Sequence, residues 1–327
     1  MSALARPSSS GESRLLVRAQ GMRKHFHGQG QVVRAVEDVS FELGEGEVLG
    51  LVGESGSGKS TLGRLILRLI EATAGHVEID GTDIMGLAPA QLRRFRRNMQ
   101  MVFQDPYASL NPRMTIGHAL AEALLLHGIC ARSEVRGRSA QLLAQVGLPA
   151  GFLDRYPKAF SGGQRQRVAI ARALASKPRF IVADEPVSAL DVSVQAEIVN
   201  LMKDLQRNLG LAMLFISHDL SVVEAVSDRV MVMYLGKTME VAPTAALYDH
   251  PAHPYTAALI QAAPGNRHGQ QKIILSGEIP SPAAPPSGCV FRTRCPFAVD
   301  ACAQQVPALR PVAPGHYKAC IRDDLEL

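Results

Sequence analysis

The sequence predicts an α/β fold with a helical insertion and a small separate tail. Between residues 85 and 160 the pattern is mostly helical, so we interpret this stretch as an inserted subdomain rather than a continuation of the sheet. Prolines are frequent over residues 243–287, which predicts a linker leading to a cysteine-bearing tail at 288–327. The core is predicted from four apolar runs typical of buried strands, separated by helical patterns: Glu47–Val52, Phe180–Ala183, Met213–Ile216 and Arg229–Tyr234.

Length, hydropathy and charge limit the functions to consider. A chain of 327 residues, 46% of them hydrophobic, is long enough for one large domain and a smaller one. Its longest apolar stretches are shorter than the roughly 18–20 residues that cross a bilayer, so any membrane role is expected to be peripheral. Residues 1–14 are predicted to form a frayed tail, and Met1–Glu12 lack the apolar core of a secretory signal. The net charge of +5 falls short of a concentrated basic face, and no nucleic-acid partner is expected.

A glycine-rich segment between an apolar strand and an amphipathic run predicts a phosphate-binding loop. The strand is Val48–Val52 and the run is Leu62–Ile70, which is the order that a P-loop requires. Glycines allow successive N–H groups to point at an anion, and the following helix adds its positive N-terminus. The segment consists of Gly53, Glu54, Ser55, Gly56, Ser57, Gly58, Lys59, Ser60 and Thr61.

Two side chains of this loop have specific chemical roles in the prediction. Lys59 would reach the β- and γ-phosphates of a nucleoside triphosphate, and Ser60 would offer its hydroxyl to Mg²⁺. The metal would bridge the terminal phosphates. The sequence therefore predicts a site for ATP and Mg²⁺.

A second apolar strand, Phe180–Ala183, is followed directly by the carboxylates of Asp184 and Glu185. Ligands bind at such strand ends in open α/β sheets. Asp184 is expected to hold the hydrated Mg²⁺. Glu185 is expected to orient or deprotonate the water that attacks the γ-phosphate.

A third element identifies a family. Ser161, Gly162, Gly163 and Gln164 open a helix that continues through Val168–Leu174, which makes a second helix start suited to an anion. Two such sites are redundant for one nucleotide unless the second serves the nucleotide of a partner chain. This element resembles the signature of the ABC transporter ATPase family, and the resemblance covers roughly residues 15–265.

The resemblance extends to further positions in the expected order. Phe26 resembles the aromatic residue that stacks on adenine, although many members have Tyr there. Gln104 resembles the glutamine that contacts Mg²⁺ and links to the membrane subunits. The segment Ser188–Asp191, which ends in Asp191, resembles the loop that lies across the dimer interface. His218 resembles the histidine that contacts the γ-phosphate.

The family resemblance implies a fold and a mode of action. It implies a RecA-like core with an N-terminal antiparallel β subdomain and a helical subdomain at about 85–160, within residues 15–265. Residues 266–327 would form the linker and a small cysteine-rich domain. It also implies a head-to-tail dimer that holds two ATP molecules, each between the loop of one subunit and the Ser161 helix of the other.

Three features resemble one branch of the family, the bacterial dipeptide, oligopeptide and nickel importer ATPases: Phe103–Arg113, Asp191–Gln195 and the proline-rich extension with late cysteines. The segment Ser60–Arg64, together with the unaltered Ser161–Gln164, resembles the F-type subunit more than the D-type. This branch implies a second, non-identical ATPase subunit, two transmembrane permeases and an external solute-binding protein, with the chain on the cytoplasmic face of the membrane. Peptide uptake is the preferred function, and nickel or another small solute is the alternative.

The tail contains four of the five cysteines: Cys289, Cys295, Cys302 and Cys320. Disulfides are not expected in a cytosolic chain, and the spacing lacks the paired Cys-x-x-Cys of common zinc sites. Four thiolates are the usual ligands of a [4Fe–4S] cluster, which some peptide-importer ATPases are thought to carry. Reduced packed cysteines and a weak zinc site remain alternatives. Cys130, in the insertion, is expected to be a small core residue.

Two other classes of protein use a P-loop. A soluble ABC-type ATPase that acts on DNA carries a long coiled coil between loop and signature, whereas only about a hundred residues separate Thr61 from Ser161. ABC-type translation factors usually carry two cassettes in one chain. A P-loop kinase or GTPase would leave the Ser161 helix and His218 without a role. The transporter ATPase is therefore the preferred interpretation.

Overall fold

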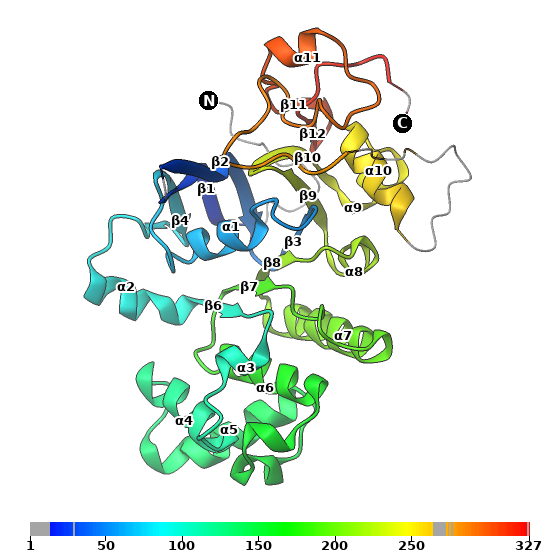
Figure 1. Ribbon diagram of the computed structural model, residues 1–327. Helices are drawn as coiled ribbons and strands as arrows, with labels where there is room; N and C mark the ends of the chain where they lie inside the picture. The colour runs from blue at the N-terminus through cyan, green and yellow to red at the C-terminus, as the bar shows by residue number, and fades with distance from the viewer. Residues whose placement is uncertain (1–13, 29, 264–272, 274, 276, 326) are drawn as a thin grey trace. The chain divides into compact units, whose positions relative to one another are not determined.

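The computed structural model describes residues 14–28, 30–263, 273, 275, 277–325 and 327 (Figure 1). The predicted frayed tail lies outside these residues apart from its last position. The chain divides into two compact units, which are described separately below. Unit 1 comprises Met1–Gly44, Val48–Met85 and Ile216–Leu327, and unit 2 comprises Glu45–Glu47 and Gly86–Phe215.

Unit 1 contains an antiparallel sheet in the order β2-β1-β4-β5. Its long strands alternate buried and exposed residues over much of their length, the pattern of a sheet that covers a core with one face. The sheet corresponds to the antiparallel β subdomain predicted for the N-terminal part. Its strands are β1 (Leu15–Gly28), β2 (Gln31–Gly44), β4 (Ala74–Ile79) and β5 (Thr82–Asp83).

A second row of strands in unit 1 runs β11-β12-β10-β9-β3. The central pair, β3 and β9, is parallel, and every residue of both is buried, which explains why their sequences are apolar apart from Arg229 at the start of β9. Helix α1 (Lys59–Ile66) follows β3 and α8 (Leu220–Val226) packs against it. The strands are β3 (Val48–Val52), β9 (Arg229–Tyr234), β10 (Lys237–Pro243), β11 (Arg310–Ala313) and β12 (His316–Lys318).

The prediction that the proline-rich stretch 243–287 forms a linker is wrong for the first part of that stretch. Helices α9 (Thr244–Asp249) and α10 (Pro254–Ala262) occupy it, and a short helix, α11 (Ala301–Gln304), follows in the tail. Pro254 is the first residue of α10, where the missing N–H has no intrahelical partner to lose. A proline at this position starts a helix instead of breaking one.

Unit 2 contains the strand row β8-β7-β6, in which β6 and β7 are parallel. Because β6 (Met99–Val102) lies within residues 85–160, that stretch is not entirely outside the sheet, as the sequence had suggested. The other predicted strands are present as β7 (Phe180–Asp184) and β8 (Ala212–Ile216). The helices are α2 (Pro89–Phe95), α3 (Pro106–Ser109), α4 (Ile116–Leu126), α5 (Val135–Gln145), α6 (Gly162–Leu174) and α7 (Val192–Leu209), with 3-10 turns at Arg96–Asn98, Arg132–Glu134, Ala150–Asp154 and Pro157–Ala159. Over the described part of the chain, no helix has the length and apolar character to span a bilayer.

A buried carboxylate fastens the C-terminal segment of unit 1 to β10. Glu240 is fully buried, and its two oxygens accept the N–H groups of Ala252 (2.7 Å) and His253 (3.0 Å). One of them also lies 2.6 Å from Nε2 of His316, on β12. His253 is itself buried, and its Nδ1 accepts the N–H of Tyr255 at the start of α10. A single carboxylate therefore joins three separate segments.

We predict that His253→Asn makes unit 1 less sensitive to acid. Burial, opposed in part by Glu240, lowers the pKa of His253 to about 4 from the usual 6.5. Between these values the unfolded chain binds a proton that the folded chain does not, so stability falls as the pH falls from about 6.5 to about 4. Asn still accepts the helix N-terminal N–H but does not titrate. Urea unfolding at pH 7 and pH 4.5 should show a stability loss smaller by up to about 3 kcal/mol in the variant; equal losses would contradict the assignment.

Candidate nucleotide-binding site

The phosphate-binding loop of unit 1 has a backbone that only glycine can adopt at two positions. Gly53 and Gly58 have φ angles of 151° and 100°. A Cβ on Gly53 would lie 2.2 Å from the carbonyl oxygen of Met233, and one on Gly58 would lie 2.2 Å from that of Ala35. The loop is thus pressed against the backbone of β9 and β2. Its glycines are needed for this close approach as well as for their dihedral angles.

Lys59, the first residue of α1, extends back into the loop. Its Nζ donates to the carbonyl oxygens of Gly53 (2.7 Å) and Glu54 (2.9 Å) and to Oγ of Ser57 (3.3 Å), and only 5% of the residue is exposed. The helix N-terminus adds a partial positive charge on the same side. A cation inside a ring of backbone groups at a helix N-terminus fits a phosphate chain, and the neighbouring Ser60 hydroxyl fits Mg²⁺.

Glu54, the second residue of the loop, is held from outside it. Its N–H donates to Oη of Tyr255 (2.9 Å). Its two carboxylate oxygens accept from both terminal nitrogens of Arg294, at 2.5 and 3.0 Å. Sequence reasoning did not find Tyr255 or Arg294, because neither belongs to a local motif and they lie 201 and 240 residues away along the chain.

The carboxylates predicted at the end of β7 are placed in unit 2. Asp184 is only 2% exposed, and Glu185 has a φ of 47°, in the left-handed region that non-glycine residues rarely occupy. Nε2 of Gln104 donates to Oε2 of Glu185 (2.9 Å). The structure therefore brings together Gln104 and Glu185, and such backbone strain at a strand end is typical of functional residues.

The Ser161–Gln164 element forms a reciprocal cap at the start of α6. Oγ of Ser161 accepts the N–H of Gln164 (3.3 Å), and the N–H of Ser161 donates to Oε1 of Gln164 (3.1 Å). A Cβ on Gly163 would lie 2.5 Å from Val194 on α7, so helix packing requires this glycine. The first N–H groups of an α-helix have no intrahelical acceptor, so the start of α6 is suited to receive an anion.

Three other predicted residues are exposed. Phe26 lies on β1 with 43% of its surface accessible and the Nζ of Lys24 4.9 Å from its ring centre. Asp191 is the residue before α7, in unit 2. His218 follows β8 and belongs to unit 1. Their roles at a nucleotide stay predictions.

Comparison with known proteins places these motifs in a family. The family described as ABC transporter matches residues 36–188, and the one described as oligopeptide/dipeptide transporter, C-terminal region, matches residues 239–302. A putative peptide import ATP-binding protein of Brucella ovis is 57% identical over 312 residues, covering 95% of this chain and 98% of the relative. This chain belongs to the ABC transporter ATPases. The oligopeptide transport ATP-binding protein AppF of Bacillus subtilis is 53% identical, with 88% and 89% of the two chains covered.

Solved structures confirm the predicted cassette fold of this ABC ATPase. A dimeric ATP-binding cassette in a post-hydrolysis state, bound to ADP and phosphate, superimposes with a TM-score of 0.65 at 31% identity. The match covers 70% of this chain and 99% of the other. The predicted activity, ATP hydrolysis, is that of the family, and ATP with Mg²⁺ is its expected substrate.

The four tail cysteines of the ABC ATPase line one small cavity in unit 1, of about 10 Å³. All are free thiols; Cys289 and Cys302 are buried, whereas Cys295 and Cys320 are partly exposed. Burial raises the pKa of Cys289 and Cys320, and that of Cys295 to about 11, so these three thiols are neutral without a bound cation. Among the described residues, no three His, Cys, Asp or Glu side chains are placed to share one metal ion.

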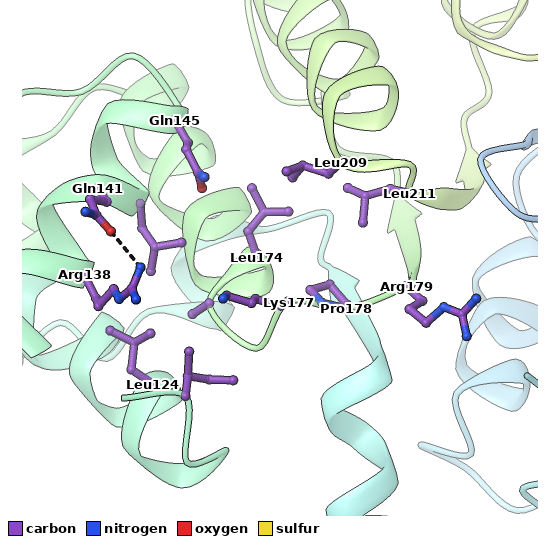
Figure 2. Close-up of a pocket in the computed structure, with 13 residues that line it drawn as sticks. Leu124, Arg138, Gln141, Gln145, Leu174, Lys177, Pro178, Arg179, Leu209 and Leu211 are labelled. Carbon is purple, nitrogen blue, oxygen red and sulfur yellow. Dashed lines mark hydrogen bonds between the residues drawn. The ribbon is translucent and has the colours of Figure 1, made fainter. Parts of the chain in front are cut away.

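A larger cavity, of about 350 Å³, lies in unit 2 of the ABC ATPase (Figure 2). Leucines of α4, α6 and the α7–β8 connection line it together with Arg138, Lys177 and Arg179, and Arg138 donates to Gln141 (3.2 Å). Arg179 directly precedes β7, whereas Asp184 and Glu185 stand at its other end. The cavity is therefore separate from the predicted catalytic carboxylates, and no sequence motif indicated it.

We predict that Gly58→Ala destabilises the ABC ATPase more than Gly56→Ala does. Both glycines have positive φ, which costs an alanine roughly 1–2 kcal/mol. Only at Gly58 would the new methyl group also meet a backbone oxygen, whereas nothing lies within 4 Å at Gly56. Urea unfolding of the two variants measures the difference. Equal losses of stability would show that the loop does not press on Ala35.

Proposed function

We propose that this ABC ATPase energises the uptake of dipeptides or oligopeptides across the cytoplasmic membrane. One observation carries the proposal: an ABC ATPase sequence and an oligopeptide-transporter C-terminal region occur in one chain, at residues 36–188 and 239–302. Relatives that match most of the chain are named as a putative peptide import ATP-binding protein and an oligopeptide transport ATP-binding protein. We also propose that residues 15–265 form the nucleotide-binding domain and that residues 266–327 form the linker and the C-terminal domain.

The proposed mechanism assigns a task to each site residue. Lys59 and the loop N–H groups grip the β- and γ-phosphates of ATP. Ser60, Gln104 and Asp184 would hold Mg²⁺, which supplies charge neutralisation of the terminal phosphates. Glu185 orients the attacking water and accepts its proton, and the amide of Gln104 fixes the direction of that carboxylate.

The remaining predicted residues act in a dimer with a second ATPase subunit. The N–H groups at the Ser161 helix start would contact the γ-phosphate held by the partner, with Asp191 at the interface and His218 on the nucleotide's own side. ATP then favours the closed dimer because it binds that state more tightly, and hydrolysis removes the preference. Two permeases, an external solute-binding protein and a peripheral location at the cytoplasmic face complete the proposal.

We predict that Glu185→Gln separates binding from turnover. The amide cannot accept the proton of water, so ATP should still bind while phosphate release falls by about 100-fold or more. Peptide uptake into proteoliposomes with the co-purified permeases should stop. Glu122→Gln, on the exposed surface of α4, is the matched control and should keep both activities.

Lys59→Ala should instead weaken ATP binding itself. Near-normal hydrolysis by the Glu185 variant would refute its role, and recovery of DNA or ribosomes without permeases would refute the transporter.

We also propose that the four tail cysteines hold a [4Fe–4S] cluster. The donor set supports this, because four thiols from separate segments line one cavity. Each thiolate of such a cluster binds a different iron, so the sulfurs need not be close enough to share one ion. The cavity of about 10 Å³ is near the size of one water molecule, so the side chains would rotate outward to admit the cluster.

Anaerobic purification followed by iron and sulfide analysis tests the cluster. We expect brown protein with equal amounts of iron and acid-labile sulfide, and loss of both in Cys295→Ser. Cys130→Ser, outside the cavity, is the matched control and should keep them. A colourless, iron-free preparation would rule the cluster out, and bound zinc would favour the alternative metal site.

A further inference from the structure

The tail segment Cys289–Cys295 contacts the cysteine cavity and the phosphate-binding loop at the same time. Cys289 and Cys295 face the cavity. Between them, Phe291 lines the same cavity and also packs in an aromatic cluster, whereas Arg294 binds Glu54. Turn hydrogen bonds, from Arg292 to Cys289 (3.1 Å) and from Arg294 to Phe291 (3.0 Å), keep the segment compact. A shift of its backbone at the cysteines therefore moves both side chains.

The side chain of Arg294 holds the carboxylate of Glu54 and lies beside Tyr234. It is 7% exposed, its two terminal nitrogens bind both oxygens of Glu54, and its carbon Cζ lies 5.9 Å from the ring centre of Tyr234. Its Nε is buried without a hydrogen-bond partner among the described residues. Leaving a buried donor unsatisfied costs free energy. Arg294 bears this cost at Nε, while its two terminal nitrogens form the bidentate contact with the carboxylate of Glu54.

Phe291 supplies a second link to the same loop residue. Its ring lies 5.2 Å from that of Tyr255 and 5.4 Å from that of Tyr234, and the two tyrosine rings are 4.8 Å apart. Tyr255 is fully buried, and its Oη accepts the N–H of Glu54. Glu54 is thus fixed at its side chain by Arg294 and at its backbone by a tyrosine that Phe291 supports.

From Glu54 the contact continues to the phosphate-binding lysine, because the Glu54 carbonyl accepts from Nζ of Lys59. We propose that Arg294 is a positioning residue for the phosphate-binding loop, and that it couples the cysteine segment 289–295 to nucleotide binding. The inference rests on the proposed binding of ATP at this loop. Arg294 orients Glu54 and neutralises a carboxylate that would otherwise repel the phosphates.

Coupling of this kind is reciprocal: if the segment sets nucleotide affinity, nucleotide must stabilise the segment by the same factor. That gives two independent measurements on the full-length chain. One is the affinity for the non-hydrolysable analogue MgAMP-PNP, measured by calorimetry. The other is backbone hydrogen exchange of residues 289–295 with and without the analogue.

We expect Arg294→Ala to weaken MgAMP-PNP binding at least about fivefold, and Arg294→Lys to have an intermediate effect because it keeps the charge but not the fork. Adding Glu54→Gln to Arg294→Ala should recover part of the affinity, since the unneutralised carboxylate is gone. Arg18→Ala is the matched control; it removes another arginine–carboxylate pair of unit 1, with Glu42, that involves neither the loop nor the cysteine segment, so affinity should not change.

In the wild-type chain, MgAMP-PNP should slow exchange of residues 289–295, and Arg294→Ala should abolish this protection. The coupling would be overturned if Arg294→Ala bound MgAMP-PNP with wild-type affinity, or if the hydrogen-exchange rate of residues 289–295 did not change when MgAMP-PNP binds. Either result would leave the ATPase assignment intact. Failure of the wild-type chain to bind MgAMP-PNP would instead refute the nucleotide site itself. If Arg294→Ala does not fold, the exchange measurement on the wild type still decides.

Discussion

The close contact between the phosphate-binding loop and the backbone around it is the constraint on which the site depends. Gly53 and Gly58 bring the loop against carbonyl oxygens of β9 and β2, and the N–H of Gly236 donates to the Ser57 carbonyl (2.9 Å). No side chain lies between the backbones at these contacts, so the loop cannot move closer to β9 or β2. Lys59 can therefore be held inside the loop before nucleotide arrives, which reduces the ordering that binding requires.

Helices and strands that show a clear pattern in their own residues could be predicted from the sequence. Those that depend on tertiary packing or on the exact position of one residue could not. The strands β3, β7, β8 and β9 were recognised because strands buried on both faces are apolar over nearly their whole length, with polar residues only at the end of β7 and the start of β9. The strand β6 was missed because four residues that include Gln100 carry almost no periodic signal. Helix α10 was missed because Pro254 was interpreted as a helix breaker, whereas at the first position of a helix proline is favoured.

The site divides in the same way. The glycines, Lys59 and the Ser161 cap could be predicted because each acts through neighbours within a few residues, as the reciprocal Ser161–Gln164 bonds show. The supports of Glu54 could not, since Tyr255 and Arg294 are isolated residues in a proline-rich region, and only tertiary packing brings them to the loop. Motifs thus indicate which residues contact a ligand. They leave out the residues that hold the motif in place.

The Arg294–Glu54 pair is better explained by the orientation it gives to Glu54 than by a contribution to the stability of the fold. Removing a guanidinium and a carboxylate from water costs free energy that their attraction roughly offsets, so a buried pair is weak support for a fold. An apolar contact would hold a loop at lower cost, but this loop must face a polyanionic ligand and keep its polar groups available. A carboxylate beside phosphates is unfavourable unless it is neutralised, and the planar fork of Arg294 both neutralises it and fixes its direction. Glu54 thereby becomes the point at which the C-terminal segment acts on the nucleotide site.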